Sequence, residues 1–94
     1  MPEKGSPGSH RRKVIREVLL YLINHPDAKD TVEGIVKWWL PQGLVDRRKE
    51  AVQAAIDFLV QREWLIKRET MPSQKIYGLN KQYLKEIREF LMEP

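Results

Sequence analysis

The sequence contains no cysteine, and this absence removes a whole group of chemistries. Without a thiol there is no disulfide, no thiolate metal site and no cysteine nucleophile. Long apolar runs are missing too, since the longest, residues 18–23, is far shorter than the roughly 20 residues that a membrane-spanning helix needs. No signal-peptide pattern precedes it. We therefore expect a cytoplasmic protein without a membrane segment.

Motifs for catalysis and metal binding are also lacking. The two histidines, His10 and His25, have no spacing that suggests a metal site. We find no phosphate-binding glycine loop and no paired carboxylates in a plausible cleft motif. We therefore expect a protein that is not an enzyme and needs no cofactor, although the chain could be a fragment or subunit of a larger enzyme.

The net charge of +4 is unevenly distributed. Residues 1–16 carry all of this excess, with five basic side chains against Glu3, and the remainder is neutral. A basic segment favours contact with nucleic acid. The basic side chains concerned are Lys4, Arg11, Arg12, Lys13 and Arg16.

The first part of the chain changes character near Ser9. Residues 1–9 contain four glycines or prolines and no apolar period, which is typical of a flexible arm. Apolar residues then recur every three or four positions up to Ile23, and predict an amphipathic helix. Ser9 is a candidate N-cap, and Pro26 ends the helix because proline forces the preceding residue out of the helical region.

Two further helices are predicted on either side of a short break. Asp30 to Glu33 has the pattern of a capping box, with Asp30 as N-cap, and predicts a helix over 31–40. The break over 41–45 contains proline and glycine. Asp46 would cap a third helix over 47–62, which has an apolar face and good helix formers.

The period then changes from helical to extended. Residues 64–70 and 75–79 are rich in branched and aromatic side chains, and 71–74 between them is typical of a hairpin loop. Asn80 would cap a last helix over 81–92. The predicted fold is mainly α with a small β-hairpin.

This order resembles that of the winged helix-turn-helix DNA-binding superfamily, over residues 12–80. The segments that carry the resemblance are 62–66, which lead into the first hairpin strand, and 76–80, which leave the second. The resemblance implies a three-helix core with a β wing over 10–80, and 81–94 would be an extra C-terminal helix. It also implies that helix 47–61 lies in the major groove of double-stranded DNA while wing 67–75 flanks it.

Long polar side chains at the start of the third helix are the candidates for DNA contact. Of these, Arg47, Glu50 and Gln53 could read bases, and Arg48 and Lys49 could meet phosphate. The alternative is that this helix end is only solvated. Glu50 and Asp57 would repel phosphate unless they face base amino groups. The other candidates are cationic: Lys67, Arg68 and Lys75 in the wing, which could equally be solvated edge residues, and Arg11, Arg12 and Lys13 near the N-terminus, which could equally be a solubilising tail.

Apolar side chains suggest contact with protein. Phe58 has no obvious place in a charged interface, so we expect it to meet the C-terminal helix or a second subunit. The tryptophans are expected in the core, with Trp38 at its margin. The C-terminal helix is expected to form a homodimer, the alternative being packing on its own first helix. Its apolar residues are Tyr83, Leu84, Ile87, Phe90 and Leu91.

The sequence is compatible with two functions. The first is a small, dimeric DNA-binding regulator of transcription. The second is a winged helix that binds another protein through Phe58, Trp38 and the C-terminal helix, as the neutral charge of residues 17–94 would allow.

Overall fold

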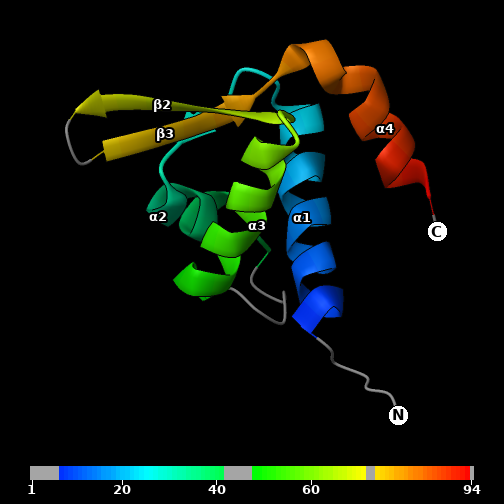
Figure 1. The fold of residues 1–94 in the computed structure, drawn as a ribbon, viewed down its shortest axis with the longest axis horizontal. Coiled ribbons are helices and arrows are strands. Elements are labelled where there is room, and N and C mark those ends of the chain that lie inside the picture. The colour runs from blue at the N-terminus through cyan, green and yellow to red at the C-terminus, as the bar shows by residue number, and fades with distance from the viewer. Residues whose placement is uncertain (1–6, 42–47, 72–73, 94) are drawn as a thin grey trace.

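The computed structural model describes residues 7–41, 48–71 and 74–93. Four α-helices and a three-stranded antiparallel sheet make up this part of the chain. Figure 1 shows helices α1, α2 and α3 grouped below a long hairpin, with helix α4 on the far side of α1. The helices and the hairpin agree with the sequence prediction, whereas the third strand was not predicted.

Helix α1 spans Pro7–Asn24. It begins two residues before Ser9, so Ser9 lies inside the helix and is not its N-cap. Proline suits this first position because its missing N–H has no helical partner there. The predicted end before Pro26 is confirmed. In the part of the chain that the structure describes, no helix is long and apolar enough to cross a bilayer.

The predicted second helix is split in two. Helix α2 covers only Val32–Gly34, and a π-helical turn, η1, continues over Ile35–Trp39. The predicted N-cap, Asp30, is wrong: Thr31 is the cap, and its Oγ1 accepts from the Gly34 amide at 3.2 Å. Asp30 instead accepts from the Thr31 amide at 2.8 Å, because its own backbone is held in a strand.

Helix α3 spans Lys49–Gln61, so it is shorter at both ends than the predicted 47–62. Arg48 occupies the N-cap position in an extended conformation, without a side-chain cap. Asp46, the predicted cap, and Arg47 lie outside the described residues. Helix α3 packs across α1, and its apolar face is fully buried at Val52 and Ile56.

The sheet has the strand order β1-β3-β2. Strands β2 (Leu65–Met71) and β3 (Gln74–Leu79) form the predicted hairpin, with the predicted limits shifted by one residue. Strand β1 consists only of Lys29–Asp30 and pairs with Gly78 and Tyr77 of β3. Figure 1 shows the hairpin reaching well beyond α2.

The C-terminal segment begins with a short 3-10 turn, η2 (Lys81–Tyr83), and continues as α4 (Leu84–Met92). Asn80 caps it as predicted, since its side chain accepts from the Gln82 amide at 3.2 Å. Helix α4 lies against α1 and buries Ile87 completely. It therefore packs on its own first helix, while the homodimer stays a prediction.

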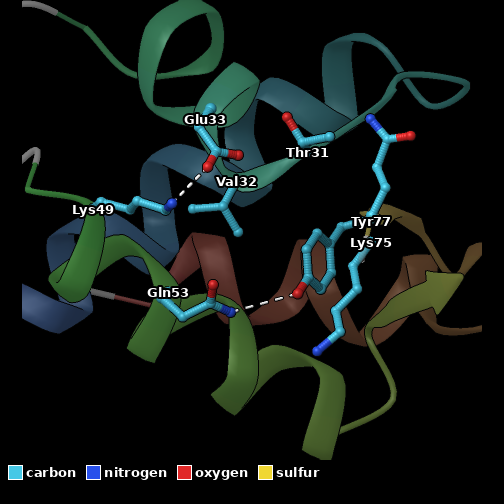
Figure 2. A pocket seen from close by; sticks show the side chains of 8 residues that line it. Thr31, Val32, Glu33, Lys49, Gln53, Lys75 and Tyr77 are labelled. Carbon is cyan, nitrogen blue, oxygen red and sulfur yellow. Dashed lines mark hydrogen bonds and ion pairs between the residues drawn. The ribbon is translucent and has the colours of Figure 1, made fainter. Parts of the chain in front are cut away.

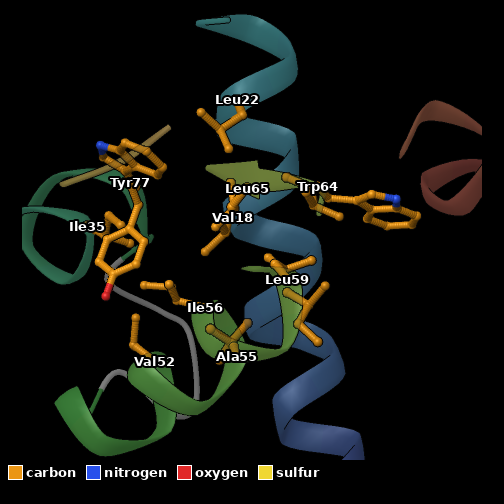
Figure 3. Packing of buried hydrophobic residues seen from close by; sticks show 14 of the residues in the cluster. Val18, Leu22, Ile35, Val52, Ala55, Ile56, Leu59, Trp64, Leu65 and Tyr77 are labelled. Atoms are coloured by element: carbon orange, nitrogen blue, oxygen red, sulfur yellow. The ribbon is translucent and has the colours of Figure 1, made fainter. Parts of the chain in front are cut away.

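The core lies where α1, α3 and the base of the hairpin meet (Figure 3). Trp64 points from the start of the hairpin toward α4, and its ring meets Phe90 edge-on at 5.5 Å. Trp39 is also in the core, as expected, whereas Trp38 is 67% exposed. The fully buried side chains of this core include Val18, Leu19, Leu22, Ile35, Ile56 and Leu59.

Candidate nucleic-acid interface

Two neighbouring hollows lie along the exposed side of α3. The first, of about 620 Å³, lies between α2, α3 and β3, and is called the α2 hollow here. The second, of about 520 Å³, lies between α3 and the hairpin, and is called the hairpin hollow. Gln53, Lys75 and Tyr77 line both hollows, and Figure 2 shows these three residues in the α2 hollow. We call the two hollows together the groove along α3.

The hairpin places two of its three predicted cations in this groove. Lys67 pairs with Tyr77 across the sheet, and Arg68 pairs with Ile76. Side chains of successive strand residues point to opposite faces. Lys67 and Lys75 therefore share the helix-facing side with Tyr77 and line the hairpin hollow, whereas Arg68 lies on the opposite face.

Hydrogen bonds hold the polar residues of α3 that line the groove. The Gln53 amide nitrogen donates to Asp57 Oδ1 at 2.9 Å and to the Tyr77 hydroxyl at 3.4 Å. Tyr77 is only 2% exposed, so its ring is packed in the core while its hydroxyl reaches the groove. The sequence predicted Gln53 at this surface but not Tyr77. Lys75, Tyr77 and Leu79 are alternate residues of one strand, and this spacing indicates that Tyr77 shares a face with Lys75.

Lys49 is paired with a carboxylate of α2. Its Nζ lies 2.5 Å from Glu33 Oε2, and both side chains are largely exposed. The hydrogen bond from Lys49 lowers the pKa of Glu33, and the same bond raises the pKa of Lys49. Glu33 therefore partly neutralises the charge of Lys49, the residue predicted to contact phosphate.

The remaining predicted DNA contacts of α3 lie at its N-terminal end. Arg48 and Glu50 are exposed there, beside Lys49. Arg47 lies outside the described residues. The predicted basic cluster thus contributes Arg48 and Lys49 to the described surface, with the latter engaged by Glu33.

Arg11, Arg12 and Lys13 belong to α1, and two of them stack on aromatic rings. Arg11 lies over the ring of Phe58 at 5.3 Å, and Arg12 lies over Phe90 at 5.6 Å. Lys13 is exposed on the same helix. Such contacts contribute about 0.5–1 kcal/mol at exposed positions, so Arg11 and Arg12 help to hold α1 against α3 and α4.

Phe58 is therefore covered from within the chain. Arg62 also lies over its ring at 5.6 Å, so two guanidinium groups contact one phenyl group. Arg62 contacts Trp64 as well, at 4.5 Å. Phe58 thus contacts a cation of α1 and the cation that follows α3, and its expected contact with a second subunit stays a prediction.

The apolar residues expected at a dimer interface are mostly used within the chain. Ile87 is fully buried, and the others are partly buried against the core. Arg16 further ties α1 to α4 by donating to the Leu91 carbonyl at 3.2 Å. The partly buried residues are Tyr83, Leu84, Phe90 and Leu91.

An apolar patch lies on another face, at the end of η1. Trp38 and Leu20 are exposed there, beside a hollow of about 340 Å³ that Tyr21 and His25 also line. Tyr21 stacks on Trp39 with ring centres 4.9 Å apart. This hollow shares no lining residue with the groove along α3.

Comparison of this chain with known protein families, with curated proteins and with solved structures finds no match. Among the residues that the structure describes, no group of three or more histidine, aspartate or glutamate side chains could hold a metal ion. The groove along α3 is the described surface that gathers the most predicted contact residues, namely Lys49, Gln53, Lys67 and Lys75.

Proposed function

We propose that this chain is a winged helix-turn-helix DNA-binding protein and a regulator of transcription. Helices α2 and α3 form the helix-turn-helix, α3 enters the major groove, and the β2–β3 hairpin is the wing that meets the DNA backbone. The added strand β1 and the order of helices and strands are compatible with this layout.

The observation that carries the proposal is the pairing of Lys67 and Lys75 with the polar side of α3 in one hollow. A DNA duplex offers base edges in its groove and phosphates along the rim. Gln53 on the helix faces the position of the base edges, while the two lysines on the hairpin face the rim. The arrangement supplies both kinds of contact from adjacent elements.

The charges elsewhere favour this face over the side of α4. A hollow between Trp64 and α4 is lined by three carboxylates, Glu86, Glu89 and Glu93, and by one cation, Arg62. This excess of negative charge repels phosphate. The groove along α3 has the opposite balance, with Lys49, Lys67 and Lys75 against Glu33 and Asp57. The duplex would therefore approach the hairpin and α3, away from α4.

A salt titration of duplex binding tests the proposal. Lys67→Ala with Lys75→Ala removes two cations from the groove, so the affinity for mixed-sequence duplex should fall and the slope of log K against log salt should drop by about 2. Fluorescence anisotropy with a labelled duplex measures both quantities.

The matched control removes the same charge from the other face of the sheet. Arg68 and Lys29 both lie there, since Lys29 pairs with the outward-facing Gly78. Arg68→Ala with Lys29→Ala should change affinity and slope much less than the lysine pair does. Equal losses in the two double variants would show that net charge alone matters, and would overturn the assignment of the groove as the DNA-binding surface. An absence of salt-dependent duplex binding in the unaltered protein would overturn the proposed function.

A second candidate function rests on the exposed Trp38. Of the residues expected to contact a protein partner, Phe58 and the apolar residues of α4 are engaged within the chain, while Trp38 is 67% exposed. Tryptophan is enriched at the centre of protein interfaces. A winged helix that binds protein through this patch would lose its partner on Trp38→Ala while Lys67→Ala left binding intact.

Dimerisation is part of the first proposal. Helix α4 ends with Met92, which is 83% exposed, next to the partly buried Leu91. A homodimer that meets along this end of α4 would carry two α3 helices, as a symmetric DNA-binding dimer does. Sedimentation equilibrium should give twice the mass of one chain, and Met92→Glu should return it to the monomer.

A further inference from the structure

The side of α3 that faces solvent carries two carboxylates and two amides. Within Lys49–Gln61 the only cation is Lys49, which is paired with Glu33. Glu50, Gln53, Asp57 and Gln61 follow at spacings of three or four residues and so lie on one side of the helix. We call these four residues the acceptor stripe.

The Gln53 amide has a fixed orientation in this stripe. A carboxylate only accepts hydrogen bonds, so the partner that Asp57 Oδ1 meets at 2.9 Å must be the NH₂ group of Gln53. The same nitrogen reaches the Tyr77 hydroxyl at 3.4 Å, which uses its second hydrogen. Gln53 Oε1 and Asp57 Oδ2 are then the atoms of this pair with capacity for an outside partner, and both are acceptors.

Acceptors in the major groove select particular base edges. Cytosine N4 and adenine N6 carry amino donors there, whereas guanine O6 and thymine O4 are acceptors. A carboxylate that faces guanine O6 or thymine O4 meets electrostatic repulsion. The Gln53–Asp57 pair of the stripe is therefore suited to amino groups, and the stripe contains no arginine, the residue that commonly reads guanine.

We propose that Asp57, held by Gln53, is a specificity-determining residue that accepts a hydrogen bond from the amino group of a cytosine or adenine. This inference rests on the proposed function, because it requires α3 to lie in the major groove. Lys67 and Lys75, across the same hollow, supply the attraction to phosphate that the stripe does not. In this arrangement the hairpin supplies affinity through Lys67 and Lys75, and α3 supplies sequence preference through Asp57.

Selection from a random duplex library, followed by affinity measurement, tests the assignment. The unaltered protein should select one orientation of one base pair, with its cytosine or adenine amino group towards Asp57, and should bind the reversed pair less tightly. Asp57→Asn has nearly the same shape but can also donate, so it should tolerate the reversed pair, which exchanges the amino group for guanine O6 or thymine O4. The ratio of affinities for the selected and the substituted duplex should fall about tenfold.

The control for the change of charge is Glu89→Gln on α4. Both variants replace an exposed carboxylate by an amide, but Glu89 lines the hollow beside α4 and lies outside the groove. It should leave the ratio unchanged. Binding of Asp57→Asn to mixed-sequence duplex should be equal to that of the unaltered protein or stronger, because one repulsive charge has been removed.

The outcomes separate this inference from the proposed function. If the protein binds duplex in a salt-dependent way but binds both orientations of every base pair equally, or keeps its ratio in Asp57→Asn, the role of Asp57 is wrong and DNA binding stands. If the unaltered protein binds no duplex, both proposals are wrong. Because Asp57 is exposed, its substitution does not threaten the core.

Discussion

The hydroxyl of Tyr83 donates a hydrogen bond to Glu63 Oε1 across 3.1 Å, and joins the end of α3 to the start of α4. Glu63 has φ of 67°, a left-handed conformation that favours glycine. Its amide bonds to the Val60 carbonyl at 2.9 Å, and the next amide, of Trp64, bonds to the Leu59 carbonyl at 3.0 Å. This is a Schellman motif with glutamate in the usual place of glycine.

The first prediction concerns Tyr83 and pH. The hydrogen bond and the charge of Glu63 raise the pKa of Tyr83 above 10.0. A group whose pKa is raised by folding stabilises the fold below its unfolded pKa, and this contribution is lost as pH rises through the folded pKa. Tyr83→Phe should therefore lower the urea midpoint at pH 7. The difference from the unaltered protein should shrink steadily above pH 10, and a constant difference would contradict this.

The second prediction separates backbone strain from the hydrogen bond. In a Tyr83→Phe background the carboxylate of Glu63 has lost this partner, so Glu63→Gly should only relieve the left-handed conformation. The free energy of unfolding should then rise by about 1 kcal/mol. In the unaltered background the gain should be smaller, since the bond to Tyr83 is lost as well. Urea unfolding of the four proteins gives the coupling.

The third prediction concerns Gly34 in α2. A Cβ at this position would lie 1.9 Å from Asp30 Oδ1, so Gly34→Ala must displace the side chain that accepts from the Thr31 amide. The usual gain of about 1 kcal/mol for alanine in a helix should be replaced by a loss of roughly 1 kcal/mol. With Asp30→Ala present, Gly34→Ala should stabilise. A thermal or urea double-mutant cycle measures this change of sign, and additive effects would refute the contact.

The fourth prediction concerns the pair Glu33 and Lys49. Because the bond from Lys49 lowers the pKa of Glu33 below its ordinary 4.5, the pair stabilises the fold above that pH and ceases to do so as pH falls through the lowered value. The stability difference between the unaltered protein and Lys49→Ala should vanish in acid.

If α3 binds DNA, Glu33→Gln should release Lys49 and raise duplex affinity at low salt by roughly threefold. Anisotropy with Glu89→Gln as control measures this.

The fifth prediction tests the core. Ile56 is fully buried between α3 and α1, so Ile56→Ala should lower the free energy of unfolding by about 2–4 kcal/mol. The matched change at Ile66, which is 39% exposed on the outer face of the hairpin, should cost much less. Similar losses at the two sites would show that the core is placed wrongly.

The parts of the fold that were predictable depend on local patterns. The apolar period of α1, the cap at Asn80 and the alternation of the hairpin strands can all be read within a short window. Strand β1 could not be, because Lys29–Asp30 carries no apolar pattern and exists through its pairing with β3. The cap moved from Asp30 to Thr31 for the same reason.

Most residues of the candidate site could be predicted from the sequence, but their positions relative to one another could not. Lys67, Lys75 and Gln53 were expected at a shared surface, yet only the strand register places Arg68 on the other face. The pairing of Lys49 with Glu33 joins residues 16 apart and depends on how α2 packs against α3. Phe58 looked unsuited to a charged surface, but the guanidinium groups of Arg11 and Arg62 cover it.

The register of the hairpin links the charge of its surface to the stability of its core. Leu65 and Leu79 pair in register at the base of the hairpin and are 2% and 7% exposed. A slip of one residue in β2 would move Leu65 into solvent and turn Lys67 away from α3 in the same step. A misaligned hairpin would therefore lose its core packing in the same step that turns its lysines away from α3. Any chain that folds to full stability also presents its lysines to the groove.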